Sequence, residues 1–237
     1  MNKAFVISFA ALFIIGSCKQ VPKSDEATVT SPKEEVKTTT GETYTVDVNA
    51  SKIEWIGTKV SGYHTGTIKI KNGELTVANG AVTAGKFTMD MTSIKAVGPD
   101  KVPADASAKL TGHLQSEDFF ETQKYPEATF VITAVEPYNG TVNEAADPRQ
   151  EKLNEYKVPN PSHMVSGNLT IKGIEKNIKF PALITVNGNS VEAHAKFNLD
   201  RKQWNIVFTG KPDDLVSDEF HLGIFLKAQS NSSTSLR

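Results

Sequence analysis

The sequence predicts an all-β protein of antiparallel strands, either closed into a barrel or stacked as a sandwich, with one short helix. From Tyr44 onward apolar residues mostly alternate with polar ones, a period of two that gives a strand one buried and one solvent-facing side. Three Asn-Gly pairs, the dipeptide that most favours tight hairpin turns, divide these alternating runs. The chain has 237 residues, 38% of them hydrophobic, which is enough for one large domain or two small ones.

Two stretches show the alternation most clearly. In Val191–Leu199 and again in Phe220–Ala228, every second residue is apolar. Antiparallel sheets accept strands with one solvent-facing side, whereas parallel sheets usually bury both sides. We expect eight or nine strands from the following runs, two of which are fused or marginal: Thr43–Val48, Lys52–Lys59, Gly66–Ile70, Glu74–Ala78, Ala81–Met91, Ala128–Tyr138, Met164–Ile171, Ile178–Val186, Ser190–Leu199 and Phe220–Ala228.

The Asn-Gly pairs predict how these strands are connected. Asn72–Gly73, Asn79–Gly80 and Asn187–Gly188 each lie between two of the runs. Both residues of such a pair accept the positive φ that a type I′ turn requires, so we expect a hairpin at each. Strands joined by hairpins favour an up-and-down barrel, although the periodicity itself is compatible with a sandwich as well.

Two segments interrupt the strand pattern. Pro103–Ser116 is predicted to be a helix, because proline is tolerated in the first turn and Leu110 and Leu114 are four residues apart. Such a helix can cap one end of a barrel. Asn139–Pro161 is polar and rich in proline, and we expect a long surface loop. The serine-rich residues 231–237 are expected to be a disordered tail.

The N-terminus predicts export and attachment to a membrane. Residues 1–17 combine an early lysine with an apolar stretch too short to span a bilayer well, the pattern of a secretory signal peptide. They are followed by a cysteine, and Ile15–Gly16–Ser17–Cys18 resembles the bacterial lipobox, whose cysteine is acylated. We expect a lipoprotein signal peptide over 1–17, a lipid anchor on Cys18, a flexible tether over 18–42 and a folded domain over 43–230. An ordinary cleaved signal is the alternative.

A lipid anchor at this position determines the expected location. Acyl chains on Cys18 would hold the protein on a membrane of the cell envelope, facing the periplasm or at the outer membrane. Lys19 favours the outer membrane, because it is not the aspartate that retains enteric lipoproteins at the inner membrane.

Composition excludes several classes of function. The net charge is −1 and the pI about 6.5, so the chain has no basic field for a nucleic-acid partner. Cys18 is the single cysteine, which excludes an internal disulfide and a multi-thiolate metal site. No nucleophile elbow, phosphate-binding loop or metal-binding histidine pair occurs in the sequence. We therefore expect a binding protein with no catalytic residues, no metal and no cofactor.

The histidines predict little chemistry. His194 and His221 lie on the polar phase of their strands, and we expect both to be solvated. His113 lies at the end of the predicted helix, where it is either a structural cap or a ligand contact.

One phase of the alternation directs large apolar side chains toward the inside of the predicted barrel. An eight-stranded barrel is either filled by such side chains or just wide enough to hold one small ligand. We therefore take these residues both as the candidate core and as candidate ligand-binding residues: Trp55, Phe87, Met89, Phe130, Ile132, Leu169, Ile171, Phe180, Ile184, Phe197, Leu222 and Ile224.

Several short motifs follow one another in the predicted domain: Gly112–Glu121, Lys124–Pro126, Thr129–Phe130, Gly167–Gly173, Phe197–Arg201 and Asp218–Leu222. In order and composition they resemble the signature of the YceI-like family, over essentially all of Tyr44–Ala228. The resemblance implies a lipocalin-like, up-and-down antiparallel β-barrel with a helix across one end. It also implies a hydrophobic cavity for a polyisoprenoid or a related amphiphilic lipid.

The chain departs from the family pattern at one place that bears on ligand binding. The family often has an Arg-Asp pair shortly before its His-Leu motif, and here Lys109–Leu110–Thr111–Gly112 stands there instead. Lys109 is the nearest remaining cation for a ligand head group, so we add Lys109 and His113 to the candidate ligand-binding residues.

Together these observations predict an envelope lipoprotein that carries or sequesters an isoprenoid or fatty-acyl lipid inside a barrel. Its expected partners are that lipid and the membrane, and a homodimer is an alternative for its assembly. Two other functions stay open. One is an envelope enzyme acting on a lipid or quinone, and the other is a stress or interaction protein whose barrel is completely filled.

Overall fold

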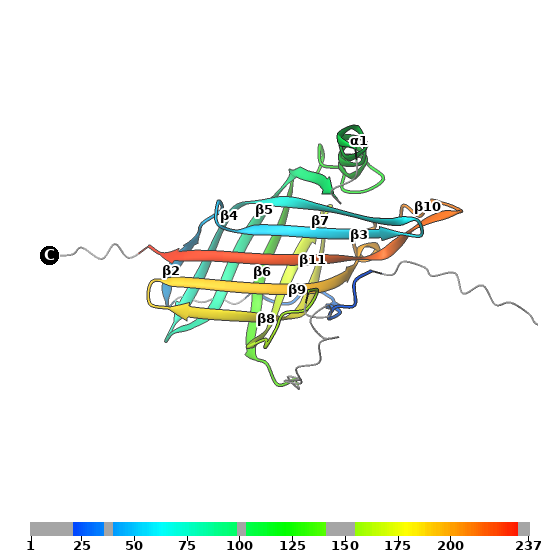
Figure 1. The fold of residues 1–237 in the computed structure, drawn as a ribbon. Coiled ribbons are helices and arrows are strands. Elements are labelled where there is room, and N and C mark those ends of the chain that lie inside the picture. Colours follow the sequence, from blue (N-terminus) through cyan, green and yellow to red (C-terminus); the bar gives the residue numbers. More distant parts are fainter. Residues whose placement is uncertain (1–20, 36–39, 99–102, 141–154, 232–237) are drawn as a thin grey trace, which may run out of the picture.

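The structure of the protein is a computed structural model that describes residues 21–35, 40–98, 103–140 and 155–231. Antiparallel strands dominate these ranges, and they surround one interior (Figure 1). The elements, in chain order, are β1 Thr28–Thr30, β2 Glu42–Val46, β3 Lys52–Lys59, β4 Gly62–Ala78, β5 Ala81–Gly98, α1 Ala104–Gln115, β6 Glu127–Pro137, β7 His163–Ile171, β8 Ile174–Asn187, β9 Ser190–Asp200, the 3₁₀ turn η1 Arg201–Trp204, β10 Gly210–Lys211 and β11 Asp214–Ser230.

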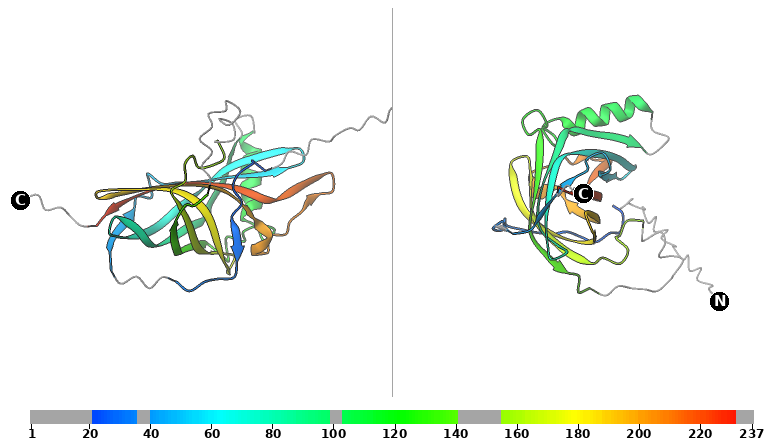
Figure 2. Two further views of the ribbon diagram at one scale, coloured as in Figure 1. Left: turned by 90° about the horizontal axis from the view of Figure 1, so that it is seen from below. Right: turned by 90° about the vertical axis from the view of Figure 1, so that its left-hand side faces the viewer.

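The strands close into an antiparallel barrel, as expected, and not into a sandwich. From β3 to β9, each strand pairs with the next strand along the chain, including β5 with β6, which are separated in sequence by α1. β11 then pairs with both β9 and β3. Eight strands of the described residues thus complete the ring, which is seen nearly end-on in the right view of Figure 2. β2 and β3 both lie between β4 and β11, one after the other, so they share one position in the ring.

The three Asn-Gly pairs at which hairpins were predicted do not behave alike. Asn79 and Gly80 both have positive φ and join β4 to β5, and Gly188 turns β8 into β9, so these two hairpins are confirmed. The predicted hairpin at Asn72–Gly73 is wrong. These residues lie inside β4, next to a bulge that falls between Ile70 and Asn72.

Close packing explains the glycine inside β4. A Cβ atom on Gly73 would lie 2.7 Å from Phe87 Cδ1 and 2.9 Å from Val46 Cγ2. Glycine is therefore needed here because two side chains cover the backbone, and not because the chain turns. The two predicted strands on either side of it are accordingly one continuous strand.

The predicted helix is present and lies at one end of the barrel. Pro103 is its N-cap residue, and Leu114 is its buried side chain. Thr111 Oγ1 accepts a hydrogen bond of 3.0 Å from the Ala96 backbone N–H, and Gln115 Nε2 donates one of 2.9 Å to the Thr92 carbonyl. These contacts fix α1 against β5 (Figure 1).

The N-terminal segment 21–35 corrects the prediction of a flexible tether over 18–42. Pairing between β8 and β9 stops at Ala182, beside Pro181, whose nitrogen carries no hydrogen for the ladder. Beyond that point segment 21–35 lies between the two strands: β1 pairs with β8, and Glu26 forms a bridge with Asn198 of β9. The segment thus supplies backbone partners where the barrel wall would otherwise be open. We call it the strap.

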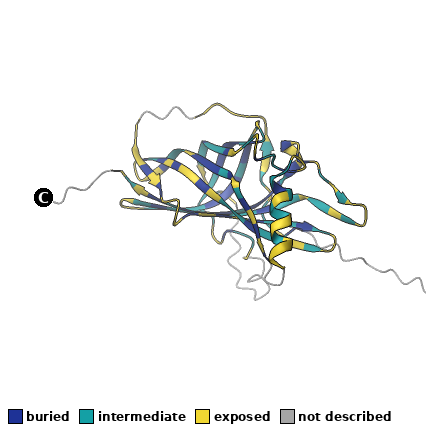
Figure 3. Cartoon of the chain, turned by 90° about the horizontal axis from the view of Figure 1, so that it is seen from above, coloured by how far each residue is buried: buried dark blue, intermediate teal, exposed yellow. Residues whose placement is uncertain are grey.

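The structure also corrects the expectation that His221 is solvated. His221 is only 3% exposed, although it lies on the outward phase of β11. Five polar residues are buried on the outward side of β7, β8, β9 and β11, and we call them the outer polar cluster: Ser166, Asn168, Asn177, Asn198 and His221. Figure 3 shows buried and exposed positions alternating along the strands elsewhere. His194, by contrast, is exposed as expected.

Other predictions fall partly or wholly outside the described ranges. Of the predicted surface loop, residues 141–154 lie outside them, while Tyr156 packs edge-on against the His221 ring at 5.6 Å. The predicted signal peptide, Cys18 and residues 232–237 also lie outside. In the described ranges, no helix combines the length and apolar character needed to cross a membrane, and no group of three potential ligands is arranged to hold a metal ion.

Candidate functional site

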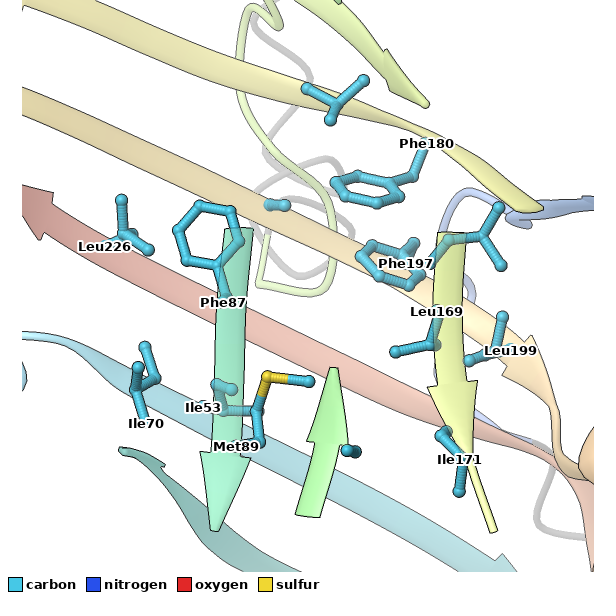
Figure 4. Close-up of a cluster of buried hydrophobic side chains, with 14 of the residues drawn as sticks. Ile53, Ile70, Phe87, Met89, Leu169, Ile171, Phe180, Phe197, Leu199 and Leu226 are labelled. Carbon is cyan, nitrogen blue, oxygen red and sulfur yellow. The ribbon is translucent and has the colours of Figure 1, made fainter. Parts of the chain in front are cut away.

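The barrel encloses an apolar cavity of about 170 Å³. Strands β3 to β9 and β11 all contribute to its wall, and every lining residue except His194 has an apolar side chain. His194 is exposed and packs its ring on Phe225 outside the barrel, with centroids 4.8 Å apart. Figure 4 shows apolar side chains from several strands converging on this interior. The barrel is therefore hollow, and the described residues offer no hydrogen-bonding side chain inside it.

The inward phase of the alternation identifies most of this wall. Of the twelve apolar candidates taken from the sequence, only Trp55 lies outside the cavity wall. The eleven that line the cavity are Phe87, Met89, Phe130, Ile132, Leu169, Ile171, Phe180, Ile184, Phe197, Leu222 and Ile224.

The sequence reasoning also missed lining residues. Small ones such as Ala193 and Ala195 lie on the same inward phase of β9 as Phe197, and that alternation could have identified them. Phe120 could not be found in this way, because it follows α1 in a turn and not in a strand.

Four phenylalanine rings form a row inside the barrel. Ring centroids are 6.3 Å apart between Phe87 and Phe130, 5.8 Å between Phe130 and Phe180, and 4.3 Å between Phe180 and Phe197. These side chains come from β5, β6, β8 and β9, so the row connects a large part of the barrel wall. It stabilises the barrel and narrows the hollow at the same time.

A second hollow, of about 310 Å³, lies at the end of the barrel beside α1, and we call it the rim pocket. Its wall combines apolar, basic and acidic side chains from β3, β4, α1, the turn after α1 and the β10–β11 hairpin. The lining residues are Trp55, Gly57, Thr58, Lys59, His64, Leu110, His113, Leu114, Phe119, Phe208, Gly210, Lys211, Asp214 and Val216.

A smaller hollow of about 80 Å³ lies between the two. It shares Trp55 and Phe119 with the rim pocket, and Phe120 and Leu222 with the barrel cavity. The three hollows therefore form one series, from an apolar interior to a polar rim.

The two polar candidates from the sequence end up in different places. His113 lines the rim pocket, donates a hydrogen bond of 2.9 Å from its Nε2–H to Asp118 Oδ2, and packs edge-on against Phe119 and Phe208. Lys109 lines none of the three hollows. Its side chain is 82% exposed, with Nζ 3.8 Å from Asp105 Oδ2.

The charged groups of the rim pocket are partly paired. Lys59 Nζ lies 2.5 Å from Asp214 Oδ2, and the Ser61 backbone N–H donates a hydrogen bond of 2.9 Å to Asp214 Oδ1. These donors lower the pKa of the Asp214 carboxyl to about 2. Burial lowers the pKa of His64, and the charge of Lys59 lowers it further, so His64 is neutral near pH 7.

Two residues that line the rim pocket each carry a buried polar atom without a hydrogen-bond partner in the part of the chain that the structure describes. Trp55 Nε1 and Thr58 Oγ1 are both buried, in residues that are 7% and 5% exposed. The Trp55 ring occupies the space over Gly66, where a Cβ atom would lie 2.3 Å from Trp55 Cζ2. A buried donor without a partner costs about 1–3 kcal/mol of stability, so such atoms usually indicate an interaction that the isolated chain lacks.

Comparisons with known proteins agree with this fold. The profile of the YceI-like domain matches residues 44–228. A UPF0312 protein of Pseudomonas putida strain W619 is 30% identical over 123 residues, which are 52% of this chain and 49% of that protein. The aligned region thus spans about half the length of this curated relative.

Solved structures show the same architecture. BcnA of Burkholderia cenocepacia superposes with a TM-score of 0.58 at 22% identity, covering 78% of this chain and 99% of that one. A polyisoprenoid-binding domain from Saccharophagus degradans, implicated in plant cell wall breakdown, superposes with a TM-score of 0.54 at 14% identity, covering 79% and 98%. The profile match extends over most of the chain and over the whole barrel, and this protein therefore belongs to the YceI-like family.

Proposed function

We propose that this protein binds the apolar chain of an isoprenoid or fatty-acyl lipid inside its barrel and carries or sequesters that lipid in the cell envelope. The observation that carries the proposal is the enclosed cavity, whose only non-apolar lining residue, His194, turns its ring outward. Such a site can bind hydrocarbon, and it has no group that would act as a catalytic acid, base or nucleophile. The polyisoprenoid-binding domain of similar fold supports the same ligand class.

The size of the cavity fits part of a lipid chain as the side chains now stand. Dry cavities of about 150 Å³ bind molecules the size of benzene, and this one measures about 170 Å³. A longer chain needs the phenylalanine row to move, or extends through the small hollow beside Phe120 toward the rim pocket. Each buried CH₂ contributes about 0.8 kcal/mol, so a few isoprene units suffice for useful affinity after ordering costs.

The envelope location is proposed from the sequence of the N-terminus. The lipobox-like Ile15–Gly16–Ser17–Cys18 would carry the acyl chains, and the strap begins three residues after that cysteine, at Val21. Since the strap is bound to the barrel, an acylated Cys18 would hold the barrel close to the membrane surface. Mass spectrometry of the mature N-terminus tests this part, and an unmodified peptide spanning Cys18 would disprove the anchor.

Lipid binding is tested by filling the cavity. Ala193 lines the cavity on β9, and Ala193→Phe places a ring in the hollow, whereas Thr185→Phe places the same ring on the exposed side of β8. We expect native mass spectrometry to detect lipid with the wild type and with Thr185→Phe, and at least about tenfold weaker uptake with Ala193→Phe. Absence of lipid uptake by the wild type, both from its host and after addition, would refute the proposal.

A further inference from the structure

We infer that the strap, segment 21–35, is a removable part of the barrel wall, and that the lipid chain enters and leaves through the slot that the strap closes. The inference rests on the proposed function, because it assigns the route by which a lipid reaches the apolar cavity. The slot lies in the side of the barrel, between β8 and β9.

The strap takes the place of a strand in the barrel wall. The direct ladder between β8 and β9 ends at the pair Ala182 and Ala195. Beyond that pair, Thr28–Thr30 of the strap pairs with β8, and the backbone of Asn198 in β9 forms two hydrogen bonds with the strap, of 3.0 and 2.8 Å. Without the strap, the wall therefore has a gap one strand wide, about 4.8 Å.

The gap leads directly to the apolar cavity. Ile178 and Phe180 of β8 stand on one edge and Phe197 of β9 on the other, and all three line the cavity. The rings of Phe180 and Phe197 stack across the slot from inside, with centroids 4.3 Å apart (Figure 4). Val29 of the strap lies opposite Ile178 and packs against the same core. When the strap detaches, the two phenylalanine rings are what still covers the cavity on this side.

The surface beneath the strap is polar, and this favours a contact that can separate. Asn198 Nδ2 donates a hydrogen bond of 3.0 Å to the Pro22 carbonyl, and the Asn168 side chain bonds both the N–H and the carbonyl of Lys33. Permanent interfaces bury mostly apolar surface, whereas interfaces that form and separate are more polar. Water can replace each of these hydrogen bonds, so detachment costs less than the loss of an equal apolar area.

The shape of the gap fits a hydrocarbon chain. Residues 25–30 of the strap are extended over about 20 Å, so their departure leaves an opening that is long and narrow. At the end of the barrel beside α1, by contrast, a chain has to pass end-first through a hollow of about 80 Å³. Through the slot it enters sideways, and it meets the apolar lining along its whole length.

A reversible cross-link tests whether the strap has to leave. Thr28 and Lys179 are cross-strand partners, whose Cα atoms are about 4.5–5.5 Å apart in antiparallel sheets, a distance that a disulfide can bridge. Thr28→Cys, Lys179→Cys is made in the full chain with Cys18→Ser, so that no other thiol is present. The control, Thr170→Cys, Glu175→Cys, ties β7 to β8 and leaves the strap untouched.

The measured quantity is the rate at which bound lipid is released. Each protein is loaded with dansylated undecanoic acid while reduced, then oxidised and mixed with an excess of phosphatidylcholine vesicles, and the decrease in probe fluorescence gives the rate. We expect the strap disulfide to slow release at least about tenfold, with full recovery on reduction. The control disulfide should change the rate by less than about twofold.

A second variant makes the opposite change. Asn168→Ala removes both hydrogen bonds to Lys33, so the strap should detach more often and release should become at least about threefold faster. Asn187→Ala, at an exposed hairpin position away from the strap, should leave the rate unchanged.

The outcomes separate this inference from the proposed function. If the wild type takes up no labelled lipid, the proposed function fails, and the route fails with it. If lipid is taken up but the strap disulfide slows release no more than the control disulfide does, the strap is a fixed part of the wall. That result would overturn the inference and leave lipid binding in place.

Discussion

Beside the strap, the inner and outer faces of the barrel wall at β8, β9 and β11 are both buried, but by different means. On the inner face, Phe180 and Phe197 stack with centroids 4.3 Å apart beside the apolar cavity. On the outer face, Asn198 donates hydrogen bonds of 3.0 Å to the Pro22 carbonyl and to Glu26 Oε1, and its Oδ1 lies 3.0 Å from His221 Nδ1. The inner face is thus held by packing, and the outer face by hydrogen bonds to the strap.

This difference has a consequence for stability and for motion. Apolar packing inside the barrel is spread over many contacts and is lost only when the barrel opens, whereas the strap is held by the short β1–β8 pairing, by the packing of Ala27 and Val29, and by a small set of side-chain hydrogen bonds. Asn168 forms two more of these bonds, donating to the Lys33 carbonyl at 2.7 Å and accepting from the Lys33 N–H at 3.0 Å. We therefore expect the strap to detach at a lower free energy than global unfolding requires.

The largest effect should come from the inner face. Phe197 is 1% exposed, and Phe197→Ala should lower the free energy of unfolding by about 3–5 kcal/mol, since it leaves a void next to Phe180. Phe225→Ala, which removes a partly exposed ring on the outside of β11, is the control and should lose less than half of that. Urea denaturation measures both, and equal losses would contradict the assignment of the two faces.

A smaller effect should follow from releasing the strap. Asn198→Ala removes three hydrogen bonds that involve Pro22, Glu26 and His221, and it should lower the free energy of unfolding by about 2–3 kcal/mol. Limited proteolysis should then cut within residues 21–35 before the barrel is degraded. Asn187→Ala, at an exposed hairpin position, should change neither measurement. Simultaneous cleavage of strap and barrel would show that they do not separate.

The outer face should also make stability depend on pH. Burial lowers the pKa of His221 to about 4, compared with about 6.5 in the unfolded chain. Between these values the unfolded chain binds a proton that the folded chain does not, so stability should be complete above about pH 6.5 and decrease as the pH falls toward about 4. Against His221→Gln, the wild type should lose an additional amount on the order of 2 kcal/mol over this range, measured by urea denaturation at each pH. Parallel curves for the two proteins would contradict the buried, neutral state of His221.

The smallest effect should come from the exposed ion pair at the edge of the strap. Lys157 Nζ lies 3.3 Å from Asp25 Oδ1, and the two side chains are 42% and 36% exposed. Exposed pairs contribute about 0–1 kcal/mol, so Asp25→Asn should change the free energy of unfolding by less than about 1 kcal/mol, and less still at high salt. A loss comparable to that of Asn198→Ala would mean that charge, and not the buried amide, holds the strap.

Prediction from the sequence succeeded where the cause was local. Alternation alone placed Phe87, Leu169 and Phe197 on the inner wall, because side-chain direction in a strand follows from position. It failed where two distant segments meet. Asn72–Gly73 has the composition of a hairpin turn, but the covering side chains of Phe87 and Val46 make it a strand.

The candidate site was predictable to the same extent. Most of the apolar cavity follows from the inward phase of the strands. For His113 the sequence left a structural cap and a ligand contact open, and the side chain lines the rim pocket. Lys109 was assigned from its neighbourhood in sequence, yet its side chain is 82% exposed and does not line the rim pocket. That Trp55 and Thr58 both line the rim pocket could not be predicted from the sequence. This pocket depends on how α1 and the β10–β11 hairpin cover the end of the barrel.

The amino-acid order by itself determined the strands, the helix, the two hairpin turns at Asn79–Gly80 and Asn187–Gly188, and the apolar lining, because each of these depends on residues only a few positions apart. Only the tertiary structure decided that segment 21–35 completes the barrel wall, that His221 is buried and that the rim pocket has two unpartnered donors. These features depend on contacts such as the one between Asn198 and Pro22, which are 176 residues apart. No local pattern of residues reports such a contact.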